Sequence, residues 1–269
     1  MNRDLLMSSA AHYRIVYEIN PYMDMSCQPD TKAALAEHEA ISAAHRAAGR
    51  TVRIMESAPQ CPDMVYTANG AFVCDQRALL GAPPPARQHE IPYFRAALKE
   101  NGLDVYDAPY PFSGQGDALA CGPFLLAGHG RRTDRRIHPI LAELFGHETI
   151  PLQTTSDQWY DLDLALAVID THTLAYHPQA LTAPSHSRLH DLGLDLIEVD
   201  AQEARAFALN LISDGTTVTM TTGAPKLAAT LRDRDLTVAE LDTTQLRKGG
   251  GGVRCTALTL DNPTPTPPP

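Results

Sequence analysis

Apolar residues along the chain gather in five short stretches that are rich in strand-forming side chains. The stretches are MVYTANGAFVC (64–74), GDALACGPFLLAG (116–128), LDLALAVIDTHTLAYH (162–177), ALNLISDGTTVTM (208–220) and VRCTALTL (253–260). In VIDTHTLAY and LISDGTTVTM the pattern predicts β-hairpins, which bend at Asp170 and at Asp214-Gly215. The centres of the stretches recur about every 45 to 50 residues, a spacing that indicates internal structural repeats.

Helical patterns lie between these stretches. The first has Asp30 as its N-cap and stops at Gly49, and the second has Thr133 or Asp134 as its N-cap and stops at Gly146. Weaker helical patterns cover 90–101, 185–192 and 224–234. The alternation of hairpins and helices predicts an α/β fold.

Two arrangements of that fold fit the pattern. One is a ring of five α/β modules, each ββαβ-like, about a pseudo-fivefold axis, which would bring the starts of the inner strands together around a central pocket. The other is an open α/β sheet whose spacing is accidental. In either case we expect one domain over residues 1–262, followed by a flexible tail over 263–269 because NPTPTPPP is too rich in proline to pack.

Composition narrows the classes of function. The net charge of −10 argues against a nucleic-acid partner, since phosphate binding needs a basic surface. No apolar run approaches the length of a membrane span, and five cysteines without a CxxC pair predict free thiols in a reducing cytoplasm. The histidines and cysteines lack metal-ligand spacing, so we expect no metal and no cofactor. A homodimer is compatible with the sequence, which does not decide the oligomeric state.

The segment KGGGGVRC (248–255) places Cys255 directly after a run of glycines. Glycines at such a place indicate positive φ or a close approach of the backbone to another group. Either could leave the thiol of Cys255 at a cavity. The alternative is an inert cysteine buried on a strand, which is the commoner fate of a free cysteine.

Five segments carry a resemblance to a known superfamily. They are HYRIVYEINPYM (12–23), PDMVYTANGAFV (62–73), FSGQGDAL (112–119), GHGRRTD (128–134) and KGGGGVRC (248–255). In this order they resemble the guanidine-modifying enzymes of the pentein fold, above all the dimethylarginine dimethylaminohydrolase and arginine dihydrolase branch; amidinotransferases belong to the same group. The resemblance covers nearly the whole chain and favours the five-module α/β propeller.

The resemblance implies a covalent mechanism. Carboxylates grip the planar guanidinium, a cysteine thiolate attacks its central carbon, and a histidine protonates the leaving amine and then activates water. Cys255 matches the nucleophile. Asp63 and Asp117 match carboxylates that bind the substrate or shape the site.

Three further residues match binding positions of the superfamily. Asn69, in TANG, corresponds to a residue that in the dihydrolase-like branch helps to determine what the bound guanidine becomes. Arg132 and Arg87 correspond to arginines expected to clamp a substrate α-carboxylate. The loop around Arg87, GAPPPARQHE, departs from the more basic and aromatic pattern of the superfamily.

The sequence departs from the superfamily at two catalytic positions. The third module usually reads Phe-Tyr-His-Leu-Asp-Thr, whereas this chain reads WYDLDLAL, so Asp161 stands where the resemblance places the catalytic histidine and Asp163 keeps the adjacent carboxylate. Ser113 stands where a glutamate or aspartate is usual.

Another group must then handle protons. His129 is the nearest histidine by module register, while His172 and His177 are expected to point away from the site. A protonated Asp161 could also serve, because Asp161 and Asp163 would share one face if they lay on a strand, and neighbouring carboxyls can share a proton.

Three interpretations remain open. The chain could be a cysteine-dependent hydrolase or transferase acting on the guanidine or amidine C–N bond of an arginine-like small molecule, with atypical proton handling. It could be a pentein repurposed for a different reaction in specialised metabolism. It could also be a ligand-binding homologue without turnover.

Overall fold

The computed structural model describes residues 1–265 and contains five three-stranded sheets. Each sheet has two antiparallel strands and a third strand that runs parallel to the middle one. Four modules are continuous in the chain. The first consists of β3 (Ala71–Cys74), β4 (Arg77–Leu80), α2 (Ile91–Glu100) and β5 (Asp104–Tyr106), and the second of β6 (Ala118–Cys121), β7 (Phe124–His129), α3 (Ile137–Phe145) and β8 (Glu148–Gln153). The third consists of β9 (Leu166–Val168), β10 (Thr173–Tyr176), α4 (Ala183–Asp191) and β11 (Asp195–Glu198), and the fourth of β12 (Ile212–Ser213), β13 (Thr217–Thr221), α6 (Pro225–Arg232) and β14 (Thr237–Leu241).

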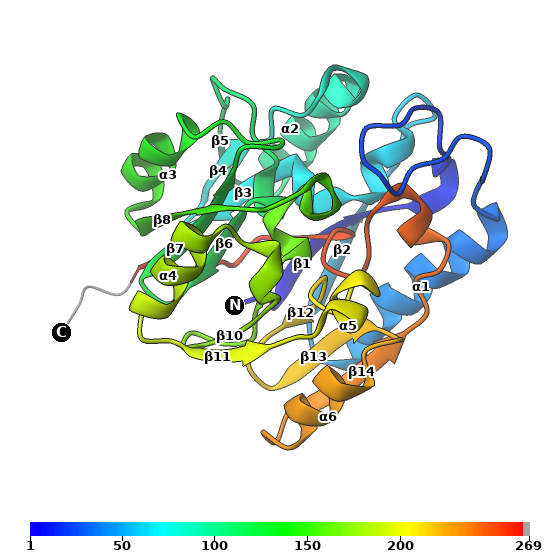
Figure 1. Ribbon diagram of the computed structural model, residues 1–269. Helices are drawn as coiled ribbons and strands as arrows, with labels where there is room; N and C mark the ends of the chain where they lie inside the picture. The colour runs from blue at the N-terminus through cyan, green and yellow to red at the C-terminus, as the bar shows by residue number, and fades with distance from the viewer. Residues whose placement is uncertain (266–269) are drawn as a thin grey trace.

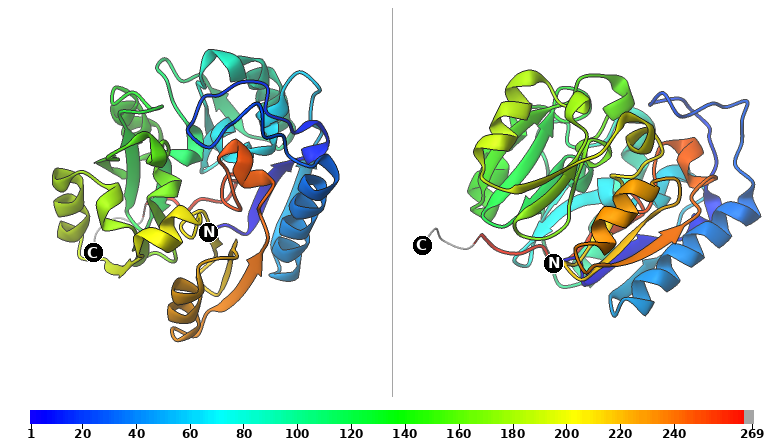
Figure 2. Two further views of the ribbon diagram at one scale, coloured as in Figure 1. Left: turned by 45° about the vertical axis from the view of Figure 1, so that its right-hand side comes forward. Right: turned by 60° about the horizontal axis from the view of Figure 1, so that its bottom comes forward.

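The fifth module joins the two ends of the chain. β15 (Ala257–Thr259) pairs antiparallel with β1 (Asp4–Ser8), and β1 pairs in parallel with β2 (Thr51–Met55) after the long helix α1 (Thr31–Ala47). The sheets surround a common centre and the helices lie on the outside (Figures 1 and 2). This ring of five ββαβ modules confirms the predicted pentein-like propeller and excludes the open sheet.

Local sequence signals account for most of the helices. The Asp30 side chain accepts the N–H of Ala33 at 2.8 Å at the start of α1, and Gly49 follows its end with φ of 77°. Gly146, with φ of 75°, ends α3 as predicted. The three weaker patterns correspond to α2, α4 and α6, whereas the short helix α5 (Ala201–Arg205) was not anticipated.

Two local predictions differ from the structure. α3 begins at Ile137, later than predicted: the Thr133 hydroxyl bonds to Asp117 in the interior and does not cap the helix, whereas Asp134 Oδ1 accepts the N–H of Arg136 at 2.9 Å in the turn that leads into it. Asp161 and Asp163 do not lie on a strand. Residues Leu162–Leu164 form a 3₁₀ turn, so the two carboxyls turn to different partners.

Both predicted hairpins are confirmed. β9 and β10 pair antiparallel across the bend at Asp170, and β12 and β13 pair across Asp214-Gly215, where Gly215 has φ of 84°. In the predicted tail, the carbonyl of Pro263 accepts a hydrogen bond from His147 Nε2 at 3.0 Å, so the chain is still packed at that residue. Positions 266–269 of the tail lie outside the described residues.

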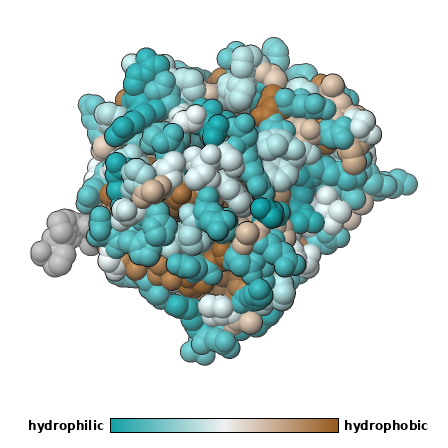
Figure 3. Space-filling model, in the orientation of Figure 1, coloured by the Kyte–Doolittle hydropathy of each residue, from teal (hydrophilic) through white to brown (hydrophobic). Residues whose placement is uncertain are grey.

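The segments that precede the five inner strands β3, β6, β9, β12 and β15 meet near the centre of the ring. Their first turns are mostly 3₁₀ helices, including 62–65, 67–70, 114–116 and 162–164. The outer face seen in Figure 1 is covered mainly by hydrophilic side chains (Figure 3). Within residues 1–265, no helix combines the length and apolar character that a membrane crossing requires.

Candidate active site

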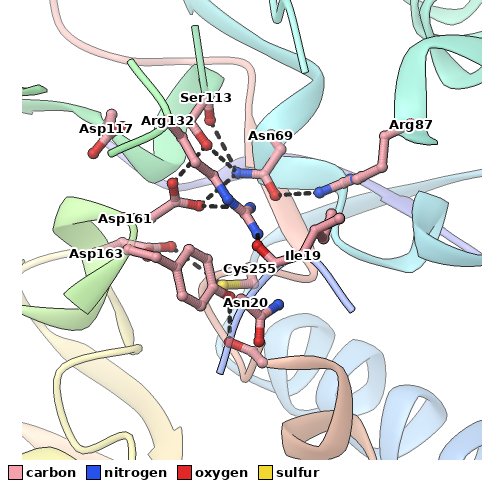
Figure 4. A network of polar contacts seen from close by, with 12 residues as sticks. Ile19, Asn20, Asn69, Arg87, Ser113, Asp117, Arg132, Asp161, Asp163 and Cys255 are labelled. Carbon is pink, nitrogen blue, oxygen red and sulfur yellow. Dashed lines mark hydrogen bonds and ion pairs between the residues drawn. The ribbon is translucent and has the colours of Figure 1, made fainter. Parts of the chain in front are cut away.

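Polar side chains from all five central segments contribute to one buried cluster. Figure 4 shows part of it, with Asn69, Ser113, Asp117, Asp161, Asp163 and Cys255 labelled. In chain order the segments contribute Asp63 and Asn69; Ser113 and Asp117; Asp161 and Asp163; Asn210; and Cys255. Each of these residues is less than 9% exposed. The ring therefore assembles in one place residues that are separated by up to most of the chain length.

The glycine run lets the segment before Cys255 pass close to the paired rings of Tyr13 and Tyr66. Gly250 adopts φ of 94°, which few side chains tolerate. A Cβ on Gly251 would overlap the ring of Tyr66, whose hydroxyl donates to the Leu246 carbonyl at 2.6 Å. The glycines are therefore needed both for backbone conformation and for close packing, as predicted.

The thiol of Cys255 lies between a carboxyl and an amide. Its Sγ is 3.3 Å from Asp163 Oδ2 and 3.1 Å from Asn210 Nδ2. Burial raises the pKa of Cys255 well above its ordinary value, and the charge of Asp163 adds to the effect. An isolated thiol in this place would stay protonated, so its reactivity depends on its two neighbours.

Asp163 is itself a perturbed acid. Burial, and then the nearby charge of Asp161, raise the pKa of Asp163 well above its usual range. Oδ2 of Asp163 contacts the sulfur, whereas Oδ1 makes no hydrogen bond within the described part of the chain. Cys255 and Asp163 thus form a thiol–carboxyl pair in which one proton can lie on either partner.

Asp161 takes part in a different network. Its Oδ1 accepts the Ser113 hydroxyl at 2.7 Å, and its Oδ2 accepts Asn69 Nδ2 at 3.1 Å and lies 3.5 Å from the guanidinium of Arg132. Asn69 also donates to the Ser113 hydroxyl at 3.0 Å. These neighbours all offer donors, which favours a charged, hydrogen-bond-accepting carboxylate at Asp161.

Arg87 lies in a position that does not match the expected clamp for a substrate carboxylate. Its side chain is only 3% exposed and donates Nε–H and an NH2 proton to the two oxygens of Glu90, at 2.9 and 2.8 Å. A third donor reaches Asn69 Oδ1 at 2.8 Å, and a fourth reaches the Asp63 carbonyl at 3.2 Å. The guanidinium is thus paired inside the protein, and it orients the amide of Asn69.

Arg132 lies nearer to solvent than Arg87. Its guanidinium carbon lies 4.1 Å from the centre of the Tyr160 ring, and NH2 points to the Ile19 carbonyl at 3.5 Å. Arg132 and Tyr160, together with the loop that holds Asn20, line an open cavity of about 510 Å³. Arg132 therefore lies between this cavity and Asp161, and its contact to a ligand stays a prediction.

Asp63 and Asp117 differ in how their charges are accommodated. Asp117 accepts the N–H of Leu162 at 2.9 Å and the Thr133 hydroxyl at 2.6 Å, and burial followed by the charge of Asp161 raises its pKa to about 7. Asp63 makes no side-chain oxygen hydrogen bond within residues 1–265, and burial raises its pKa to about 6 although Arg87 lowers it. Asp117 is thus held by Thr133 and Leu162, whereas the carboxylate of Asp63 lies near Arg87, with Oδ2 3.9 Å from Nε.

The structure does not bring a histidine to the thiol. His129 lies at the end of β7 against the ring of His138, and His177 bonds to the Val199 carbonyl at 2.8 Å. His172 is exposed at the hairpin bend, in agreement with the expectation that it points away. Among the described residues no histidine makes a polar contact with Cys255 or Asp161, and no group of three or more His, Cys, Asp or Glu could hold a metal ion.

Sequence reasoning missed Asn210. It supplies the fourth segment's contribution to the cluster, and its side chain contacts both Cys255 and the Asp163 backbone. A signal was present: in ALNLISDG, Asn210 is a polar residue flanked on both sides by apolar residues. It also stands at the start of an inner strand, as the site residues of the other modules do.

This five-module ring around a buried cysteine and several carboxyls is that of the guanidine-modifying pentein superfamily. The chain belongs to the family described as N,N dimethylarginine dimethylhydrolase, eukaryotic, whose model matches residues 18–260. It is 35% identical to an N(G),N(G)-dimethylarginine dimethylaminohydrolase of Mycobacterium tuberculosis, over 96% of this chain and 86% of the relative.

The chain is also similar to a cyanobacterial arginine dihydrolase. The bifunctional arginine dihydrolase/ornithine cyclodeaminase ArgZ of Synechocystis sp. is 30% identical over 96% of this chain but only 38% of its own length. The crystal structure of its N-terminal domain, bound to product, superposes with a TM-score of 0.93 at 29% identity and covers 98% of this chain and 99% of that domain. The chain thus corresponds to the N-terminal domain of ArgZ in length and fold.

Proposed function

We propose that this protein is a cysteine-nucleophile enzyme that cleaves a guanidine or amidine C–N bond of an arginine-like small molecule, as a hydrolase or an amidinotransferase. The observation that carries the proposal is the contact of the Cys255 thiol with Asp163, 3.3 Å apart, at the centre of a buried acidic cluster. The kinship with hydrolases of arginine derivatives supports it.

The charge of the cluster favours a cationic ligand. Its buried or nearly buried ionisable groups are Asp63, Glu90, Asp117, Asp161 and Asp163 against Arg87, Arg132 and Arg254. Acids outnumber bases, and burial holds the pKa of several of these acids high. A planar cation with N–H edges would stabilise their ionised forms and could be gripped by two carboxylates at once.

Proton handling follows from the thiol–carboxyl pair. The Cys255 proton passes to Asp163, the sulfur lone pair forms a C–S bond at the central guanidine carbon, and the C=N electron pair moves onto nitrogen. When the C–N bond breaks, the leaving amine takes up the proton. Water, or an acceptor amine in the transferase case, then adds to the carbon, loses a proton to the carboxylate, and the C–S bond breaks.

Asp163 suits the proton-carrying role better than Asp161. Asp163 touches the sulfur and has a raised pKa, whereas Asp161 accepts hydrogen bonds from Ser113 and Asn69 and so fits a fixed anion that grips the cation. An Asp161→Asn variant tests the assignment. We expect it to raise KM through lost cation binding, and a variant with full activity would remove Asp161 from the mechanism.

The decisive experiment is intact-protein and small-molecule mass spectrometry after incubation with arginine, methylated arginines, hydroxyarginine and agmatine. We expect a product, or an adduct on Cys255 that the Cys255→Ala variant does not form. Cys27→Ala is the matched control, because Cys27 is an exposed thiol that can react unspecifically. An unmodified protein with every substrate untouched would refute the proposal and leave a binding homologue or another reaction.

A further inference from the structure

Asn210 sits at the junction of the nucleophile and its supporting turn. It is fully buried, and its Oδ1 accepts the backbone N–H groups of Gly252 at 3.0 Å and Cys255 at 3.2 Å. Its Nδ2 lies 3.1 Å from Cys255 Sγ and 3.4 Å from the Asp163 carbonyl. One side chain therefore contacts the thiol, the turn that carries it and the segment of its carboxyl partner.

These contacts determine which way the amide points. Backbone N–H groups can only donate, so the side that faces Gly252 and Cys255 must be the oxygen. The opposite side, the NH2 group, is then held toward the sulfur. Rotation of the amide by 180° would set two donors against donors and leave the Asp163 carbonyl against an oxygen.

A fixed N–H donor has a directional effect on the thiol–carboxyl pair. It can donate to sulfur but cannot accept the S–H proton, and a hydrogen bond to a charged acceptor is about twice as strong as one to a neutral acceptor. The donor thus favours the state in which sulfur is the thiolate and Asp163 carries the proton. The other neighbour of the sulfur is Asp163. When Asp163 is ionised, its charge disfavours a thiolate at Cys255.

We propose that Asn210 is a positioning residue that orients Cys255 and biases the shared proton from sulfur toward Asp163. This inference rests on the proposed function of Cys255 as a nucleophile. Asn210 does not contact the reacting carbon; it acts through the sulfur.

The variants Asn210→Asp and Asn210→Leu together test the donor. An aspartate keeps the shape and an oxygen that can accept both backbone N–H groups, but it replaces the donor that faces sulfur and, when ionised, adds a charge there. Leucine removes the donor without adding a charge, so a midpoint that rises in Asn210→Asp but not in Asn210→Leu would overturn the proposal. The control is Asn101→Asp, because Asn101 also donates through its side chain, to the Ala97 carbonyl at 2.7 Å, at the end of α2 and outside the central cluster.

The readout is the pH dependence of Cys255 alkylation by iodoacetamide, followed by peptide mass spectrometry. We expect Asn210→Asp to move the midpoint up by at least about one pH unit, equivalent to tenfold less thiolate at a given pH, while the melting temperature and the Asn101→Asp profile stay near those of the parent protein. A changed opening of the buried site would alter the plateau rate and not the midpoint. A parental midpoint in Asn210→Asp would overturn the proposal.

A second measurement needs no substitution at Asn210. In the parent protein, the ¹⁵N and ¹H resonances of the Asn210 side-chain amide should titrate with Cys255, and this titration should disappear in Cys255→Ala. An amide signal that is unaffected by the thiol would overturn the proposal even where Asn210→Asp fails to fold. Neither measurement uses a substrate, so failure of the catalytic proposal and failure of this inference are distinguishable.

Discussion

The buried pair of Arg87 and Glu90 provides a test of what stabilises the site. Both side chains are 3% exposed, and the fork of Arg87 meets both oxygens of Glu90. Glu90→Gln keeps the shape and one acceptor but removes the charge. Breaking a buried pair from one side costs about 3 to 5 kcal/mol. The low end applies to Glu90→Gln, because Arg87 keeps a second carboxylate nearby, with Asp63 Oδ2 3.9 Å from its Nε.

That cost converts to a measurable change in melting temperature. An unfolding entropy of about 2.1 cal/mol/K per residue gives about 0.56 kcal/mol/K for 269 residues, so the expected loss lies at the low end of roughly 5 to 9 °C. Thermal unfolding followed by circular dichroism at pH 7.5 measures it. Urea unfolding gives the free energy independently.

The chain contains a matched control. Arg53 and Asp4 meet in the same two-point geometry, at 3.0 and 2.8 Å, but their side chains are 49% and 30% exposed. Asp4→Asn should cost no more than about 1 kcal/mol. If Glu90→Gln and Asp4→Asn lower stability equally, burial is not the source of the effect and the reasoning fails.

Three further predictions concern charge in the site. Burial raises the pKa of Asp117 to about 7, above its unfolded value, so the folded state binds the extra proton and stability should fall as pH rises from about 4 to 7; Asp117→Asn should flatten this slope in urea titrations, and an unchanged slope would contradict it. Binding of a cationic substrate should release protons from Asp63, Asp117 and Asp163, so affinity should increase from pH 5 to 8. Calorimetry in two buffers of different ionisation enthalpy should detect the release, and equal observed binding enthalpies in the two buffers would count against it. Arg132→Met should raise KM for arginine about 10- to 100-fold but leave agmatine, which lacks the carboxylate, nearly unaffected, and equal changes for both would exclude a carboxylate contact.

Local patterns predicted much of the framework because their physics is local. The Asp30 cap, the glycine stops at Gly49 and Gly146 and the bend at Gly215 depend on neighbouring residues along the chain. Where a side chain had a distant partner, the local signal misled: Thr133 bonds to Asp117 instead of capping a helix. The two aspartates at 161 and 163 read as one strand face but occupy a 3₁₀ turn.

The sequence by itself determined the periodic α/β modules, the glycine-flanked Cys255 and the acidic residues available to a cation. Tertiary structure alone decided that Asp163 and Asn210 are the neighbours of Cys255, that Arg87 is paired with Glu90, and that no histidine of the described chain contacts the thiol. Cys255 is separated from Asp163 by 92 positions and from Asn210 by 45. Such pairings depend on closure of the ring and on shared burial, which local periodicity and capping signals do not encode.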